Sequence, residues 1–302
     1  MTSVDDFLYD GESVFIGRKG TINKPLYYNG KFWTVDTLFY THSFVNVLPK
    51  FAYCLFQTIN WLKYNEASGV PSLSKATIEK IKVRVPSMDE QGKLSNQLFL
   101  LDKRIEVQNK IIEKLETLIK GIRHNVFQQL RKDVGFNSTI GDILSFEQPQ
   151  RYIVSSTEYS DDSSCTPVLT ANKAFILGYT TETDGIYSKG DCIIIDDFTL
   201  DCKYVSFPFK IKSSAIKILT AENKYILRFI YEYLKSLDIS TEEHKRHYIT
   251  EIQPSSCILP DDKTLTTIAL MFESITNKLE NEQSLALMLN KQKQYLLSKM
   301  FI

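Results

Sequence analysis

The fold is decided by the stretch Val85-Pro86-Ser87-Met88-Asp89-Glu90-Gln91 and the apolar residues that follow it. After this stretch, leucine and isoleucine recur at alternating steps of four and three residues, interrupted by the polar residue Gln108. Such spacing predicts a long helix with a narrow coiled-coil seam, which requires a partner helix to be stable in water. The seam positions are Leu94, Leu98, Leu101, Ile105, Ile112, Leu115, Ile119 and Ile122.

The same pattern recurs 174 residues later in the chain. Pro86 then falls on Pro260, and the segment Lys50-Phe51 falls on Lys224-Tyr225. A chance match of apolar residues could explain the helical part, but it does not explain why the preceding segments keep the same offset. We therefore predict two copies of one module. The seam of the second helix consists of Ile268, Phe272, Ile275 and Leu279.

Each module is expected to be a mixed α/β globule followed by its long helix. We predict an α+β fold in which two globules are separated by two long helices, packed as an antiparallel coiled coil and related by a pseudo-two-fold repeat. The expected division is a first globule over 1–87, a helix over 88–133, a second globule over 134–259 and a helix over 260–302. The first globule is expected to be partial, because nothing in residues 1–130 matches the segment that opens the second copy.

Within the first module, short β-branched and aromatic runs at 13–16 and 32–35 predict strands. Apolar spacing predicts a helix over 50–64, and the alternation of residues 81–86 predicts a last, half-buried strand.

Composition narrows the possible functions. The chain has 302 residues, with 36 basic and 36 acidic groups, so it is not a polycation that holds nucleic acid by bulk charge. The five cysteines are scattered, which argues against a disulfide framework or a structural zinc site. The first residues lack the pattern of a signal peptide, and no apolar run is long enough to span a bilayer, so we expect a cytoplasmic protein.

Several of these stretches resemble the specificity subunits of type I restriction–modification systems. The resemblance rests on the run from Ile81 to Gln91 with the Leu101-Asp102 that follows, on the segment from Tyr9 to Gly20, and on Ile140-Gly141-Asp142-Ile143-Leu144. It covers nearly the whole chain. The second copy departs from it, because Leu259-Pro260-Asp261-Asp262 lacks the Glu-Gln pair.

The resemblance implies a non-catalytic subunit with two target-recognition domains that read a bipartite site in double-stranded DNA. It also implies that two adenine methyltransferase subunits dock on the helices, and that restriction and translocase subunits join the same complexes. S-adenosylmethionine would then bind the methyltransferases, and this chain would need no cofactor and no metal. The alternative is a coiled-coil scaffold that tethers two protein-binding domains without recognising DNA.

Two basic loops are candidate DNA contacts. Gly17-Arg18-Lys19-Gly20 follows a predicted strand, so its amides together with the Arg18 and Lys19 cations could hold a phosphate; a solvated hairpin turn is the alternative. The second loop contains His244, Lys245, Arg246 and His247, and it aligns with residues 70–73 of the first copy. It could contact DNA, lie in solvent, or hold zinc through its two imidazoles, although no third ligand is evident.

The acidic groups Asp196, Asp197 and Asp201 have two possible interpretations. With Lys203 they resemble an acidic nuclease centre, whereas the simpler interpretation is a set of acidic turns at strand ends. No methyltransferase motif or Gly-rich cofactor loop is present in the sequence, which argues against an independent methylase.

Charge is unevenly distributed between the predicted domains. Residues 1–86 carry 10 basic and 7 acidic groups, whereas residues 136–259 carry 12 basic and 17 acidic groups. We therefore expect the chain alone to bind random DNA weakly, with tight binding requiring its partners.

Overall fold

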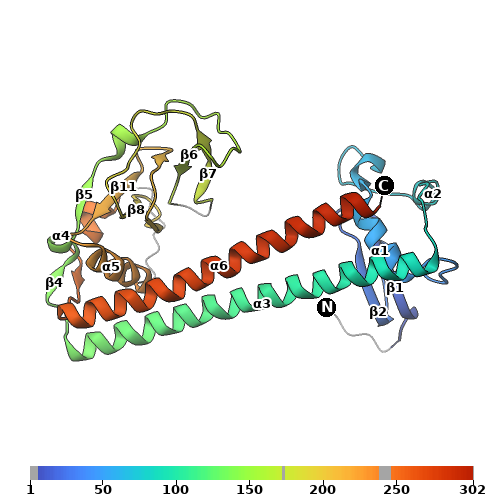
Figure 1. The fold of residues 1–302 in the computed structure, drawn as a ribbon, viewed down its shortest axis with the longest axis horizontal. Coiled ribbons are helices and arrows are strands. Elements are labelled where there is room, and N and C mark those ends of the chain that lie inside the picture. Colours follow the sequence, from blue (N-terminus) through green and yellow to red (C-terminus); the bar gives the residue numbers. More distant parts are fainter. Residues whose placement is uncertain (1–5, 172–173, 238–245, 302) are drawn as a thin grey trace. The chain divides into compact units, whose positions relative to one another are not determined.

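The computed structural model describes residues 6–171, 174–237 and 246–301. It contains two compact units, Met1–Ile112 with Asn281–Ile302, and Glu113–Glu280, which we call the first and the second unit. The helices α3 (Met88–Asp133) and α6 (Asp262–Met300) each contribute residues to both units (Figure 1). The predicted α+β class, with two β-rich globules and two long helices packed together, is confirmed.

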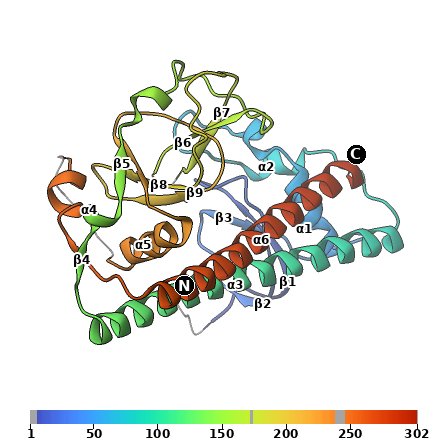
Figure 2. The ribbon, with the colours of Figure 1, turned by 60° about the vertical axis from the view of Figure 1, so that its left-hand side comes forward.

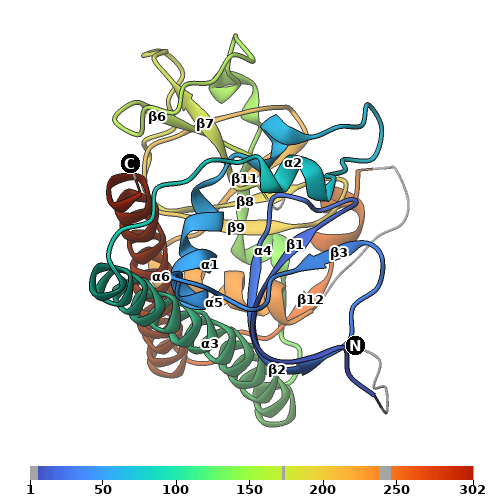
Figure 3. The same ribbon diagram turned by 90° about the vertical axis from the view of Figure 1, so that its right-hand side faces the viewer.

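The first unit is built on a three-stranded antiparallel sheet. Its order is β2 (Leu26–Phe32), β1 (Tyr9–Gly17) and β3 (Leu38–Tyr40), so that β1 is the central strand, as Figure 3 shows. The helix α1 (Pro49–Thr58) packs against β1 and β2. A short 3-10 turn and the helix α2 follow; the 3-10 turn spans Trp61–Tyr64 and α2 spans Lys75–Glu79. The core of this unit contains Ile16, Ile22, Trp61 and Leu73, all nearly inaccessible to solvent.

The second unit contains a four-stranded sheet in the order β5 (Ser145–Glu147), β11 (Ile216–Thr220), β8 (Cys192–Asp196) and β9 (Cys202–Val205). Every residue of β8 is buried: Ile193 and Ile195 pack in the cluster that holds α5 (Lys224–Ser236), whereas Ile194 packs in a separate cluster with Tyr187 and Phe209. Figure 2 shows α5 beside β8 and β9. The other elements are β4 (Ser138–Thr139), α4 (Ile140–Ile143), a 3-10 turn (Pro149–Tyr152), β6 (Thr166–Leu169), β7 (Ile176–Thr180), β10 (Lys210–Ile211), a π-helical turn (Tyr248–Ile252) and β12 (Ser256–Cys257).

The sheet registers show that the two units repeat one topology. Phe15 of β1 pairs with Leu26 of β2 on one side and Tyr40 of β3 on the other. Ile194 of β8 likewise pairs with Lys203 of β9 and Ile218 of β11. The strands β1, β2 and β3 therefore correspond to β8, β9 and β11.

A partly buried tyrosine also repeats between the units. The hydroxyl of Tyr27 donates to the Glu12 carboxylate, and the hydroxyl of Tyr204 donates to Asp191 Oδ2 at 2.7 Å. Burial and the hydrogen-bonded carboxylate both raise the pKa of each phenol above its usual range, so both tyrosines stay neutral donors. Glu12 lies in β1 and Asp191 directly precedes β8, whereas the tyrosines lie in the equivalent strands β2 and β9, so the repeat extends to side chains.

Two polar pairs fix the register of α3 and α6 within the first unit. Gln108 Nε2 donates to the Glu282 carbonyl at 3.0 Å and also to the Glu282 carboxylate, and Lys293 Nζ lies 2.5 Å from Asp102 Oδ1. Residues later in α6 thus contact residues earlier in α3, so the helices are antiparallel there. Gln108 and Glu282 are also equivalent under the 174-residue repeat, which places a local two-fold relation at this pair.

The predicted seam residues lie on the inner side of their helices. Leu98, Leu101, Ile119 and Phe272 are buried, and the rest are partly buried. The partly buried seam residues are Leu94, Ile105, Ile112, Leu115, Ile122, Ile268, Ile275 and Leu279.

Both long helices begin at capping residues that occupy equivalent positions. Ser87 Oγ accepts from Glu90 N, and the Glu90 carboxylate accepts from Ser87 N in return, at 3.1 Å. At the start of α6, Asp261 Oδ1 accepts from Thr264 N at 3.0 Å. The second copy therefore keeps the cap with different residues, with Asp261 and Thr264 in place of Ser87 and Glu90. Gln91 is fully buried, and its Oε1 accepts from Leu48 N at 2.8 Å.

Some expected elements differ in the structure. The predicted helix over 50–64 ends at Thr58, and a 3-10 turn follows at Trp61–Tyr64. The predicted strand over 32–35 is wrong, because β2 ends at Phe32. The predicted strand over 81–86 is also absent. Its counterpart β12 exists because it pairs with β4, whereas residues 82–85 have no strand partner among the described residues.

A buried carboxylate joins α5 to both long helices within the second unit. Glu232 Oε2 accepts from Arg123 of α3 at 2.7 Å, and Glu232 Oε1 lies 3.0 Å from Arg228, whose guanidinium donates to the Phe272 carbonyl of α6 at 3.2 Å. The Glu232 side chain is only 1% exposed.

Replacing Glu232 with glutamine should lower the free energy of unfolding of the second unit by about 3 kcal/mol, because two guanidinium groups lose their buried counter-charge. The exposed Glu222→Gln variant is the control and should change stability by less than about 0.5 kcal/mol. Urea unfolding followed by circular dichroism measures both variants. Equal stability of the two variants would show that this ion pair does not hold α5 in place.

Candidate nucleic-acid interface

The loop after β1 is held tightly by backbone hydrogen bonds. Arg18 N donates to the Thr37 carbonyl at 2.8 Å, and Gly20 N donates to the Pro71 carbonyl at 2.8 Å. Gly20 has a φ of +82°, which favours glycine. At Gly17 a Cβ atom would lie 2.1 Å from the Thr21 carbonyl oxygen, so only glycine fits. The loop backbone is therefore ordered.

The two cations of this loop point away from the core. Arg18 and Lys19 are both exposed. The Arg18 guanidinium lies over the Phe39 ring at 5.8 Å and donates to the Asp36 carbonyl at 3.2 Å, contacts that orient it without neutralising it. Within the part of the chain that the structure describes, no carboxylate forms an ion pair with either side chain. Both charges remain available to an anion.

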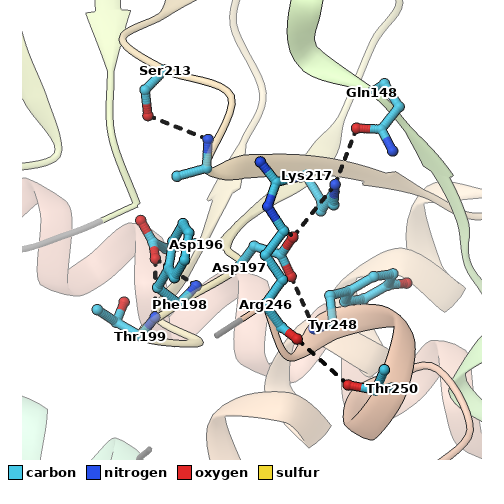
Figure 4. A network of polar contacts seen from close by, with 11 residues as sticks. Gln148, Asp196, Asp197, Phe198, Thr199, Ser213, Lys217, Arg246, Tyr248 and Thr250 are labelled. Atoms are coloured by element: carbon cyan, nitrogen blue, oxygen red, sulfur yellow. Dashed lines mark hydrogen bonds and ion pairs between the residues drawn. The ribbon is translucent and has the colours of Figure 1, made fainter. Parts of the chain in front are cut away.

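The corresponding loop of the second unit centres on Asp197, which Figure 4 shows within its network. Asp197 Oδ2 lies 3.4 Å from Lys217 Nζ, and both side chains are almost fully buried. Asp197 Oδ1 accepts from Tyr248 N at 2.9 Å, and Lys217 Nζ donates to Gln148 Oε1 at 3.0 Å. Arg246 extends from this network with its Nε 3.9 Å from Asp197 and its side chain 53% exposed. Asp197 therefore anchors the loop and leaves Arg246 at the surface.

The histidine loop is only partly described. His244 and Lys245 lie outside the described residues. The His247 side chain is buried, and its Nδ1 lies 2.8 Å from Glu251 Oε1, so in this structure the imidazole fixes the loop and does not face solvent. The prediction that His247 contacts DNA directly does not fit this burial. Within the described ranges, no group of three potential ligands that could hold a metal is found.

The carboxylates of Asp196 and Asp197, near this loop, form hydrogen bonds and an ion pair that stabilise the turn after β8. Asp196 Oδ1 accepts from Phe198 N at 2.9 Å and from Thr199 N at 3.0 Å. Asp197 is committed to its ion pair with Lys217. Both carboxylates are thus used by the fold, which favours acidic turns over a nuclease centre at this place.

The two candidate loops occupy the same position in the repeated module. Leu73 N donates to the Arg18 carbonyl at 2.9 Å, and His247 N donates to the Asp197 carbonyl at 2.8 Å. Arg18 and Asp197 follow equivalent strands, and Leu73 and His247 are 174 residues apart, so the two bonds are equivalent. The candidate loop predicted in the first copy follows the central strand, whereas the one predicted in the second copy is the equivalent of residues 70–73. In each unit the structure joins these two kinds of loop by a backbone hydrogen bond. An alignment of the two central strands could have predicted this, because it makes Arg18 and Asp197 equivalent positions.

All five cysteines are free, and four of them are buried. Burial raises the pKa of the Cys54 thiol to about 12, with a further contribution from Asp102. The thiol is neutral at pH 7 and therefore a weak nucleophile.

Residues 1–117 match the family described as the type I restriction modification DNA specificity domain. Over 143 residues the chain is 41% identical to the specificity subunit of the type I restriction enzyme EcoR124I/EcoR124II of Escherichia coli, covering 45% of this chain and 35% of that protein. The chain thus matches about a third of the length of this curated relative.

The fold is similar to that of a solved relative. The crystal structure of a type I restriction–modification S subunit from M. genitalium superposes with a TM-score of 0.73 at 15% sequence identity, covering 99% of this chain and 85% of the other. At this identity the likeness concerns the fold alone. Among the described residues, no helix has the length and apolar character to span a bilayer.

Replacing Gly17 with alanine should destabilise the first unit by about 1–3 kcal/mol, because the new methyl group meets the Thr21 carbonyl. Gly69→Ala is the matched control in the same unit, since nothing lies within 4 Å of the added Cβ atom there. Differential scanning calorimetry should show a lower transition temperature for the first variant only. A parallel shift in both variants would contradict the described loop geometry.

Proposed function

We propose that the chain is a type I restriction–modification specificity subunit and that it recognises a specific, bipartite sequence in double-stranded DNA. In this proposal the chain itself performs no chemistry. Adenine methyltransferase subunits that bind S-adenosylmethionine modify the DNA, and restriction and translocase subunits join the complex. Each unit contributes one half of the recognition surface.

The observation that carries the proposal is the repeated loop pair at the end of each central strand. In both units the same backbone hydrogen bond joins the two loops, and one exposed arginine projects from them, Arg18 in the first unit and Arg246 in the second. An ordered backbone with an exposed guanidinium suits a phosphate or a guanine edge. Two such positions in one chain suit a target with two halves.

The charge of the chain supports the proposal that its partners provide part of the affinity for DNA. The sequence up to residue 86 carries a small positive excess, and residues 136–259 carry five more acidic than basic groups. Non-specific affinity for DNA grows with the number of phosphates that cations neutralise. The proposed role of this chain is therefore to choose the site, while the methyltransferases provide much of the affinity.

Arg18→Ala and Arg246→Ala should each weaken binding of the complex with its methyltransferases to target DNA by about tenfold. If the arginine contacts only phosphate, the affinity of the complex for target DNA and for random DNA should fall equally, and the slope of log affinity against log salt concentration should decrease by about one. If the arginine contacts a base, only the affinity for the target should fall. Fluorescence anisotropy over a salt series measures these effects.

The controls for this experiment are Lys80→Ala in the first unit and Lys212→Ala in the second, both exposed cations outside the loops. Loss of affinity in the controls equal to that in the arginine variants would remove the loops from the interface. Binding of the complex without any preference among sequences would leave the scaffold interpretation in place.

The partner surface that we propose is the outer side of α3. Leu100, Val107 and Ile111 are 70%, 50% and 39% exposed, and their spacing of seven and four residues puts them on one face of the helix. Exposed apolar side chains in a row are typical of protein–protein contacts. We assign this face to a methyltransferase subunit.

Val107→Asp should weaken assembly with the methyltransferase at least tenfold, because a carboxylate would lose its hydration in an apolar interface. Asn109→Asp introduces the same group two residues away, on a different face of α3, and should assemble normally. Size-exclusion chromatography with light scattering measures the complex. Normal assembly of the Val107 variant would exclude this face.

A further inference from the structure

The first unit contains an open groove, whereas the corresponding place in the second unit is filled by side chains. The groove has a volume of about 830 Å³ and lies between α1, residues 81–86, the start of α3 and the end of α6. Its apolar wall includes Leu55, Ile59 and Phe301. Under the 174-residue repeat these residues correspond to Phe229, Tyr233 and Phe127 of the second unit.

In the second unit the corresponding space is filled by the segment that contains β4, α4 and β5. Ile140 is fully buried and Leu144 is 2% exposed, and both belong to one cluster with Phe127, Phe229 and Tyr233. The groove of the first unit is thus lined by the counterparts of the residues that cover Ile140 and Leu144.

The backbone beside the groove also lacks its partner. In the second unit, Ile140 N donates to the Ser255 carbonyl at 3.0 Å and Asn137 N donates to the Cys257 carbonyl at 3.2 Å. The counterparts of Ser255 and Cys257 are Ile81 and Val83. The peptide groups of residues 82–85 form no hydrogen bond within the described chain, and Val83 is 44% exposed.

The sheet of the first unit also differs from that of the second unit at its edge. The strand β11 pairs with β8 on one side and with β5 on the other, whereas its counterpart β3 pairs with β1 alone among the described residues. One segment, residues 137–147, therefore supplies three things in the second unit: the partner of β12, the core residues Ile140 and Leu144, and the edge strand next to β11.

We propose that this groove, with the unpaired backbone of residues 82–85 beside it, is a docking site for a strand-and-turn polypeptide segment that resembles residues 137–147. The segment adds a strand to residues 82–83, inserts two aliphatic side chains and continues along β3. Charge supports this occupant, since the groove carries Lys63, Lys82, Arg84 and Lys93 against Glu90. Residues 137–147 carry two carboxylates, Asp142 and Glu147, and no cation.

The probe is a fluorescein-labelled synthetic peptide with the sequence of residues 136–147, titrated with the full chain and followed by fluorescence anisotropy. Saturable binding is expected. A peptide with Ile140→Asp and Leu144→Asp should bind at least tenfold more weakly, because both side chains would enter an apolar wall.

A variant of the chain distinguishes binding in the groove from binding to the second unit, where the peptide could displace residues 136–147 of the chain. Val83→Asp changes only the first unit at an already exposed position and should weaken peptide binding at least tenfold. Val70→Asp, at a position 67% exposed and outside the groove, is the matched control and should bind as the wild type does. Circular dichroism verifies that both variants fold.

Three results would overturn the proposal. They are the absence of saturable binding, equal binding by the Val83→Asp and Val70→Asp variants, and displacement of the peptide by duplex DNA of random sequence, which would assign the groove to nucleic acid. The titration itself contains neither DNA nor methyltransferase. A failure to bind the peptide would therefore contradict only the proposed docking site, and a failure to recognise DNA would contradict only the proposed function.

Discussion

The antiparallel packing of α3 against α6 is the constraint on which the rest of the structure depends. Their apolar seams alone would tolerate a shift of one heptad, because leucine and isoleucine recur along both helices. The polar pairs Gln108–Glu282 and Asp102–Lys293 remove this freedom, since a shifted register would leave a partly buried polar group without its partner. Because Gln108 and Glu282 are repeat equivalents, this register also pairs equivalent positions of the two helices with each other.

Each module uses the same frame and differs at its surface. The central strand, its two neighbours and the tyrosine–carboxylate bond repeat, and so does the hydrogen bond between the two candidate DNA-binding loops. At the end of the central strand, Arg18 over Phe39 in one unit is replaced by Asp197 beside Lys217 in the other. A common backbone with different charged side chains suits two units that recognise different halves of a target.

The predictions from sequence failed where an element depends on a distant partner. Residues 81–86 alternate as a strand should, yet they form none in the first unit, because a two-residue strand such as β12 exists only through pairing with β4. His247 was a candidate DNA contact next to Arg246, but its side chain is buried and lies against Glu251. In both cases the local pattern was correct, and the environment that decides its role lies far away in the chain.

The motifs of the sequence indicated the resemblance to type I specificity subunits, and the sequence by itself determined the two long helices and the repeat. These follow from spacing and offset, which are properties of the chain that hold in any environment. Only the tertiary structure decided that Asp197 is an anchor, that Arg246 and not His247 reaches the surface, and that the groove beside residues 81–86 stands open. The physical reason is that burial and hydrogen-bond partners are set by residues from other elements, which no local pattern records.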